Sequence, residues 1–457
     1  MWIFALLNAC SETQTPAEAE PVVEIPLVDV WGVPNAADED DEPGVVQVNL
    51  EASKADVELL PGVTTEVWAY NGQVPGPLIH LRLGDTLRVH FENELPDETT
   101  IHWHGLRISD EQDGIAAIME PVANGGSFDY EFTPPEAGSY WYHPHMQANE
   151  QIERGLQGVI VVDEPERPAV DRDRYFVVDD VLLDENGKIE GGFQQPDGMT
   201  IMMGRFGNTL LTNGSTEVLT DTVAPGSIER WRLVNTANAR ALYFKVKGAS
   251  WRIVATDGGI VDAPYEQTKG FIVPGQRYDL EVRVDEDATD PVTLELLTEA
   301  NGGEKFTVFE ADVAGDPLPE HDVEWTPLAL PEVVDAEQDV EIILDADTSG
   351  TQLAWTINGK AYEDGDTMSA LGGVPTRIEL TEKSGVSHPF HLHGQFFQIV
   401  ERDGEVVDEP GFHDTVYVEG DSKVSLFTNL ENPGRWMAHC HIAEHLEAGM
   451  MFGFTVE

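Results

Sequence analysis

From Val45 to the end of the chain, hydrophobic and polar residues alternate in short runs that turn residues interrupt. Alternation with a period of two places one face of a strand against a core and the other against water. Asn-Gly, Pro-Gly and Asp-Gly pairs separate many of these runs, as they do between antiparallel strands. The segments that read most clearly as strands are residues 45–52, 64–70, 87–93, 128–134, 158–164, 227–235, 243–248, 278–284, 377–382 and 423–429.

Helical periodicity is scarce, and the best candidate is a short turn after Cys440. The pattern predicts an all-β protein built from Greek-key β-sandwiches in series. A chain of 457 residues exceeds a single ordinary core. Boundaries are predicted near residues 163–174 and within the acidic, proline-rich stretch 315–340. The expected organisation is a leading segment 1–44 followed by domains at 45–165, 166–320 and 321–457.

The first ten residues, MWIFALLNAC, are apolar up to Cys10, and a polar stretch follows. This segment resembles a bacterial lipoprotein signal, although its apolar run is short and no Lys or Arg precedes it. We expect an exported protein of the periplasm or cell envelope, with Cys10 as a lipid anchor. Residues 11–44 are expected to be a linker, because Ala37 to Gly44 is too charged to pack. No later stretch reaches the roughly 18–20 apolar residues that span a bilayer.

The charge balance is extreme, with 84 acidic against 26 basic residues and a net charge of −58. A phosphate backbone would be repelled by such a surface, so nucleic acid is excluded as a partner. We interpret the excess as a solvated acidic shell, which suits a saline habitat; attraction of cationic substrate or copper is the alternative.

Ten of the 14 histidines fall in four clusters. The clusters are His102 and His104; His143 and His145; His388, His391 and His393; and His439 and His441 around Cys440, followed by His445 and Met450. Side chains two residues apart on a strand point to one face, so each pair can donate two imidazoles to one metal centre. Imidazole suits copper, zinc, iron and nickel, so the histidines alone leave the metal open.

The fourth cluster narrows the choice. Two imidazoles, a thiolate and a weak axial thioether are the ligands of a blue-copper site, and His388, Cys440, His445 and Met450 supply that set. On an extended strand Cys440 points away from His439 and His441, so two metal centres would be joined by a few covalent bonds over about 10 Å.

In this order, the four clusters resemble the copper signatures of multicopper oxidases, a family built from three cupredoxin domains. Residues 45–457 carry the resemblance, and PGRWMAHCHIAEHLEAGMM is similar to bacterial laccases and periplasmic cuprous oxidases. The resemblance implies four copper ions. Type 1 copper would be held by His388, Cys440 and His445 with Met450 axial, type 2 copper by His102 and His391, and the type 3 pair by His104, His143, His145, His393, His439 and His441.

The implied activity is that of a laccase-like oxidase. Electrons from a reducing substrate would pass through Cys440, and O2 would be reduced to water. Proton supply needs carboxylates near the cluster. Asp113 matches the family's first acid, but Leu446 stands where the second normally follows the last histidine, and Glu447 comes one step later.

Alternative interpretations remain for several residues. His80 and His90 are expected to be ordinary sheet residues, and His413 is a weaker candidate for the type 1 edge. Met199, Met202 and Met203 are expected to be core residues rather than a Cu(I) patch. Residues 300–355 contain no Met, which favours phenols or similar organic donors over Cu(I), although Glu363 and Asp364 leave an acidic group for a cuprous site.

The pattern leaves three alternatives to a laccase-like oxidase. The runner-up is a cuprous oxidase for copper tolerance. A non-catalytic copper-binding protein is disfavoured by the complete ligand set, and a copper nitrite reductase is disfavoured by the paired His motifs. The natural substrate and the oligomeric state stay open.

Overall fold

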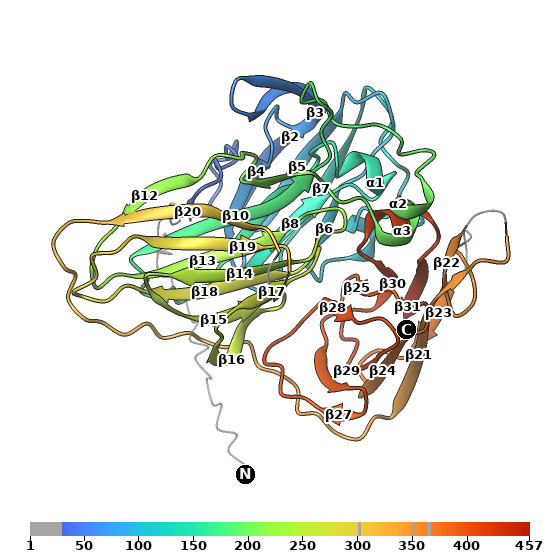
Figure 1. Cartoon of the computed structure of the whole chain (residues 1–457). Helices are drawn as coiled ribbons and strands as arrows, with labels where there is room; N and C mark the ends of the chain where they lie inside the picture. The colour runs from blue at the N-terminus through green and yellow to red at the C-terminus, as the bar shows by residue number, and fades with distance from the viewer. Residues whose placement is uncertain (1–29, 300–302, 351–352, 363–366) are drawn as a thin grey trace, which may run out of the picture.

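The computed structural model describes residues 30–299, 303–350, 353–362 and 367–457. Cys10, Glu363 and Asp364 lie outside this part of the chain, and so do their predicted roles. The described strands form six sheets, two in each of three successive domains, and this confirms the predicted all-β class. In Figure 1 the first domain is blue to cyan, the second green to yellow, and the third orange to red. Among the described helices, none has the length and apolar character needed to cross a membrane.

The first domain pairs a four-stranded sheet in the order β3-β2-β5-β7 with a second in the order β4-β9-β8-β6. Their bounds are β2 (Val45–Leu60), β3 (Val63–Tyr70), β4 (Gly76–Arg82), β5 (Thr86–Asn93), β6 (His102–His104), β7 (Gly126–Phe132), β8 (Gly138–His143) and β9 (Gly158–Asp163). Alternating residues of these strands bury one shared core between the sheets.

The second domain pairs a seven-stranded sheet with a five-stranded sheet. The strands are β1 (Val30–Trp31), β10 (Arg172–Val181), β11 (Thr209–Thr212), β12 (Leu219–Val223), β13 (Ile228–Asn235), β14 (Leu242–Lys247), β15 (Ser250–Thr256), β16 (Gly259–Glu266), β17 (Gly270–Ile272), β18 (Arg277–Arg283), β19 (Val292–Leu297) and β20 (Lys305–Val313). An extended stretch without strands, residues 314–337, then leads to the third domain.

The third domain pairs a six-stranded sheet with the five-stranded sheet β23-β31-β30-β25-β28. The strands are β21 (Gln338–Asp347), β22 (Ala354–Ile357), β23 (Thr367–Ala370), β24 (Thr376–Glu382), β25 (His388–Leu392), β26 (Gln398–Arg402), β27 (Glu405–Val406), β28 (Thr415–Val418), β29 (Lys423–Thr428), β30 (Gly434–Cys440) and β31 (Met451–Val456).

Helices are few and short: η1 (Asp110–Gln112), α1 (Ala148–Gln151), α2 (Gly198–Met203) and α3 (Ala443–Glu447). The last is the turn that the sequence predicts after Cys440. Although α1, α2 and α3 come from three different domains, α1 and α2 both contact α3, and Figure 1 shows them gathered at one corner. This corner brings the three domains together next to the candidate metal centres.

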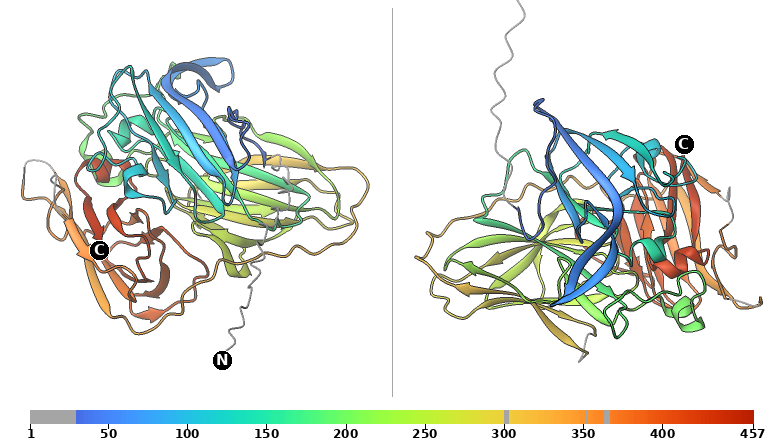
Figure 2. Two further views of the ribbon diagram at one scale, coloured as in Figure 1. Left: turned by 180° about the vertical axis from the view of Figure 1, so that it is seen from behind. Right: turned by 90° about the horizontal axis from the view of Figure 1, so that it is seen from above.

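The predicted linker packs against the domains at residues 30–33, whereas most of its charged part, residues 37–44, is exposed. Val30 and Trp31 form β1, which pairs in parallel with Asp173 and Arg174 of the second domain, and Val33 is buried as well. The apolar side chains of this segment are stabilised by burial, while most of the acidic residues after it remain exposed. As a result, the chain touches the second domain before it enters the first, as the blue segment in Figure 2 shows.

Candidate metal centres

A thiol and two imidazoles meet in the third domain. His388 begins β25, Cys440 ends β30 and His445 lies in α3. Cys440 Sγ is 3.4 Å from His388 Nδ1 and 3.6 Å from His445 Nδ1, and the two Nδ1 atoms are 3.0 Å apart. All three side chains are fully buried. We call these residues the thiolate set.

Met450 lies beside the thiolate set, because its carbonyl accepts a hydrogen bond from the backbone N–H of Cys440 at 3.0 Å. Its side chain is fully buried. Trp355 packs its ring against His445 with ring centroids 4.2 Å apart. Glu382 places a carboxylate oxygen 3.7 Å from His388 Nε2 on the outer side. The set is therefore enclosed by protein on several sides.

The eight remaining cluster histidines, here called the imidazole cluster, converge from the first and third domains. Three groups of ligand atoms lie close enough to hold a metal ion: His102, His104 and His391; His104, His143 and His441; and His145, His393 and His439. We call the last two groups the two triads. Each triad combines histidines of the first and third domains. They divide the six histidines predicted for the type 3 pair into two sets of three.

Strand alternation separates the two groups as the sequence predicts. Cys440 belongs to the thiolate set, while its neighbours His439 and His441 belong to two different triads of the imidazole cluster. In the sheet, His439 lies opposite His391 of β25. Adjacent residues of β30 thus point to opposite faces.

Burial keeps histidines of the imidazole cluster in the neutral form that binds metal ions. Burial lowers the pKa of His145 to about 3 and holds the pKa of His393 and His439 well below the usual histidine value. Neutral imidazole keeps the lone pair that a metal ion needs. Nε2 of His102 and Nε2 of His391 are buried and have no hydrogen-bond partner, so both atoms are available to bind a metal ion.

The side chains of the thiolate set also fit a bound metal ion. Burial raises the pKa of the Cys440 thiol, so an ionised sulfur there needs a bound cation. A thiolate, imidazoles and a thioether are soft and intermediate donors that suit copper. Both groups therefore fit copper ions.

Asp113 lies in contact with the imidazole cluster. Its Oδ2 accepts a hydrogen bond from His393 Nδ1 at 2.7 Å, and its backbone carbonyl accepts one from His102 Nδ1 at 2.9 Å. Because both rings donate from Nδ1, Nε2 of each ring is left as the atom that can bind a metal ion. The predicted acid is therefore placed to orient two candidate ligands.

Glu447 and Leu446 point in different directions. Glu447 Oε1 accepts a hydrogen bond from the backbone N–H of Ala148 at 2.7 Å, whereas Leu446 is buried against Ile152. Burial raises the pKa of Glu447. Its carboxyl group and His145 line one cavity of about 620 Å³, so the acid lies near the cluster without a direct contact.

Asp414, which no sequence motif marks, touches the imidazole cluster from the third domain. Its Oδ1 lies 3.2 Å from His104 Nε2, and its backbone carbonyl accepts from His391 Nδ1 at 2.9 Å. Burial opposes ionisation, but the adjacent charge of Arg277 holds the pKa of Asp414 well below its usual range. The only local signal was its place beside His413.

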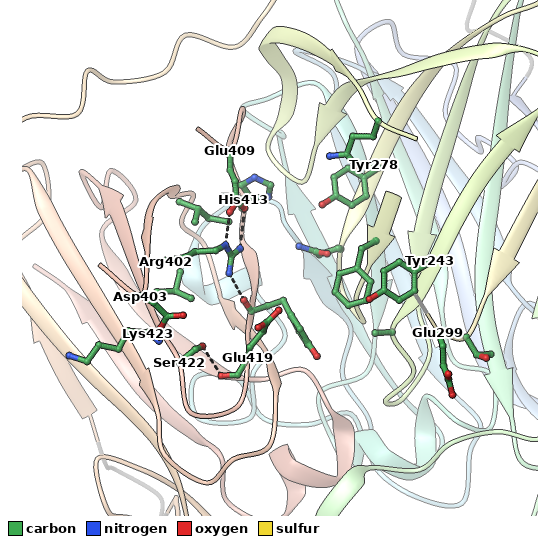
Figure 3. Close-up of a pocket in the computed structure, with 18 residues that line it drawn as sticks. Tyr243, Tyr278, Glu299, Arg402, Asp403, Glu409, His413, Glu419, Ser422 and Lys423 are labelled. Atoms are coloured by element: carbon green, nitrogen blue, oxygen red, sulfur yellow. Dashed lines mark hydrogen bonds and ion pairs between the residues drawn. The ribbon is translucent and has the colours of Figure 1, made fainter. Parts of the chain in front are cut away.

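The histidines outside the clusters have other contacts. His80 lies in β4 and His90 in β5, which confirms them as sheet residues. His413 Nδ1 faces Asp257 of the second domain at 3.4 Å. It lines a cavity of about 690 Å³ between the second and third domains, where Arg402 faces Tyr278 (Figure 3). None of the candidate ligands lines this cavity.

Helix α2 covers the thiolate set. Asp197 caps it by accepting from the backbone N–H groups of Met199 and Thr200. The carbonyl of Met202 accepts a hydrogen bond from His445 Nε2 at 3.2 Å. Met202 packs against the core of the third domain, as predicted. Met199 is 71% exposed and Met203 41%, so the core prediction is wrong for these two residues.

Three family models, each described as multicopper oxidase, match residues 51–167, 177–291 and 335–457. They cover one domain each. Curated relatives include a multicopper oxidase of Mycobacterium tuberculosis, 28% identical over 86% of this chain and 83% of its own length. Laccase-5 of Trametes villosa is 30% identical over 88% of both chains.

Solved structures show the same architecture. A multi-copper oxidase from Pseudomonas thermotolerans superposes with a TM-score of 0.80 at 30% identity, covering 90% of this chain and 99% of the other. A multicopper oxidase from Campylobacter jejuni, described as a metallo-oxidase, superposes with a TM-score of 0.81 at 26% identity. The match covers 94% of this chain and 96% of the other.

Proposed function

Because the chain belongs to the multicopper oxidase family, whose members are oxidoreductases that use O2, we propose that it is a laccase-like oxidase with four copper ions. In this proposal the thiolate set with Met450 holds type 1 copper. His102 and His391 hold type 2 copper, and the two triads hold the type 3 pair. Bound copper supplies one-electron redox chemistry and O2 reduction to water.

The observation that carries the proposal is the position of Cys440 between His439 and His441. One strand residue serves the thiolate set while both neighbours serve the imidazole cluster. The peptide and side-chain bonds of these three residues form a short covalent path between the two groups. A copper-storage protein gains nothing from such a path, whereas an enzyme that moves electrons between two centres needs it.

The electron donor is proposed to dock on the outer face of α2. His388 and His445 are both fully buried, and His445 reaches the helix through the Met202 carbonyl. Electrons therefore cross the helix rather than pass by direct contact with an imidazole edge. The absence of Met from residues 300–355 favours phenols and aromatic amines as donors.

A cuprous oxidase is the second candidate, and α2 gives a specific reason for it. Met199 and Met203 expose thioethers on the helix that covers His445, and thioethers are soft ligands that select Cu(I). The relatives include both laccases and a metallo-oxidase, so both donor classes occur among similar proteins.

One assay separates these functions: oxygen consumption by copper-loaded protein with 2,6-dimethoxyphenol, with Cu(I), and with neither. We expect uptake with the phenol and loss of that uptake in the Cys440→Ser variant. A strong preference for Cu(I), abolished in Met199→Leu/Met203→Leu, would select the cuprous oxidase. No uptake with either donor by fully loaded protein contradicts the oxidase proposal.

We also propose export to the cell envelope with a lipid anchor at Cys10, supported by the lipoprotein-like segment that ends there. Metabolic labelling with a palmitate analogue in the native host tests it. Label is expected on the natural chain and absent from Cys10→Ser. An unlabelled natural chain that fractionates with the cytosol contradicts both parts.

A further inference from the structure

Three methionines gather where the imidazole cluster comes nearest to solvent. Among the eight histidines of the cluster, His145 alone is partly exposed, and the others are buried. The cavity of about 620 Å³ that His145 lines is also lined by Met146, Met437 and Met451. We call these three residues the methionine group.

Sheet register explains why two of the three flank a candidate ligand. Met437 and His439 are two residues apart on β30, so their side chains share one face. Met451 of β31 lies directly opposite His439, and the residue opposite Met437 is Gly453. Met437 and Met451 are therefore diagonal neighbours on that face. Gly453 carries no side chain that would fill the space beside Met437.

The third methionine comes from the first domain. Met146 follows His145, whose Nε2 is 3.3 Å from His439 Nε2. His393 Nε2 lies 3.0 Å from the same atom. The methionine group thus shares a cavity with one member of the triad formed by His145, His393 and His439, and no member of the other triad lines that cavity.

Core filling accounts for only part of this arrangement, because Met437 is buried and Met451 packs against an apolar cluster that includes Leu446. Methionine usually fills irregular gaps in a core, but these three side chains border an open cavity. Met146 and Met451 are partly exposed, while Met437 is 4% exposed. Three methionines that line one cavity with the least buried histidine of the cluster offer soft donors to a metal ion there.

We propose that Met146, Met437 and Met451 bind Cu(I) and pass it to the His145–His393–His439 triad when the protein acquires its metal. This inference rests on the proposed copper chemistry of that triad. The transfer exchanges copper–thioether bonds for copper–imidazole bonds. All donors are neutral and the ion keeps its charge, so no proton or electron has to move.

The test starts from full-length protein produced without copper. Cu(I) is offered anaerobically as its bathocuproine disulfonate complex, and copper per chain is followed over time. In Met146→Leu/Met437→Leu/Met451→Leu, copper uptake by the imidazole cluster is expected to slow about tenfold or more, in line with the loss of supporting metal contacts. Met→Leu conserves volume, so the fold should persist.

Two controls make the test specific. The matched variant Met199→Leu/Met203→Leu removes exposed thioethers outside the cavity and should acquire copper in the imidazole cluster at the wild-type rate. Given a long incubation with Cu(II), the triple variant should reach the wild-type copper content and oxidase activity. That result shows that the methionine group acts in loading and not in turnover.

A redox-inert probe provides an independent measurement. Titration of fully copper-loaded protein with Ag(I) should show one bound ion more in the wild type than in the triple variant. Equal loading rates together with equal Ag(I) binding would overturn this inference while leaving the oxidase proposal intact. Wild-type protein that takes up no copper at all would instead overturn the oxidase proposal, and the loading site with it.

Discussion

Arg277 of the second domain and Asp414 of the third form a two-point ion pair, with Nη1 2.9 Å from Oδ1 and Nη2 2.7 Å from Oδ2. Both side chains are buried. Asp414 Oδ1 also lies 3.2 Å from His104 Nε2 of the first domain. The second domain supplies none of the candidate ligands, yet this pair connects it to the imidazole cluster.

Asp414→Asn should weaken copper binding by the imidazole cluster about 10–100-fold, because the variant loses the carboxylate that orients His104. The blue colour of the thiolate set should survive. Copper content after dialysis against a graded chelator measures the effect. Glu379→Gln is the control, since its ion pair with Lys423 is exposed and contributes little. Loss of the blue colour with an intact imidazole cluster would contradict the assigned contact.

Gly275→Ala should disturb the triad of His104, His143 and His441. A Cβ at Gly275 would lie 2.9 Å from His441 Cδ2 and 3.2 Å from His104 Cε1. We expect a selective loss of type 3 copper signals in the near-ultraviolet spectrum.

Gly404→Ala is the matched control for this change. Gly404 has φ +81° against +91° at Gly275, but no atom lies within 4 Å of its added Cβ. Both variants carry similar backbone strain, about 1–2 kcal/mol, so only the contact with the histidines differs. Equal spectra from the two variants would refute a steric effect on the triad.

Asp179→Asn should stabilise the protein above neutral pH. Burial, followed by the nearby charge of Asp180, raises the pKa of Asp179 to about 7. A carboxyl group whose pKa is higher in the folded state than its unfolded value of about 4 stabilises the fold at low pH. That contribution is lost as the pH rises from about 4 to 7, and the variant lacks this dependence.

At pH 8 the free energy of unfolding of Asp179→Asn is expected to exceed that of the wild type by about 1–2 kcal/mol. This value allows for the partial exposure of the Asp179 side chain. Gln157 can reverse its amide to accept from the new amide, because its Oε1 has no partner. Thermal unfolding of both proteins at pH 5 and pH 8 measures the difference. A variant that gains as much at pH 5 as at pH 8 would show that ionisation of Asp179 is not the cause.

Salt should stabilise the whole fold. The chain carries 84 acidic and 26 basic residues, and mutual repulsion of this excess opposes compaction. The screening length falls from about 30 Å at 0.01 M to about 3 Å at 1 M salt. The melting temperature should rise over this range by similar amounts in NaCl and KCl. A fall in melting temperature would show that attractive ion pairs outweigh the repulsion.

The strands and the candidate metal ligands could be predicted because their signals are local. Alternation in residues 227–235 marks β13, and the spacing of His439, Cys440 and His441 alone separates the two metal groups. The pairing of His391 with His439 is a tertiary contact, but both residues lie in motifs that mark them as ligands.

The rest depends on contacts between residues far apart in the sequence. Arg277 and Asp414 are separated by 137 positions, and neither lies in a motif that identifies a partner. The same limit applies to β1, whose pairing with Asp173 depends on a sheet formed much later in the chain. The methionine group likewise draws on three separate segments, so sequence spacing carries no signal for it.

The thiolate set and the two triads depend on different numbers of domains. Every member of the thiolate set belongs to the third domain, while each triad is shared between the first and third. On the proposed assignment, a chain cleaved in the extended stretch 314–337 would keep all type 1 copper ligands on one fragment and would divide the ligands of both triads between the two fragments. On the same assignment, a third domain folded by itself would keep the blue colour but would lack the first-domain histidines that O2 reduction needs.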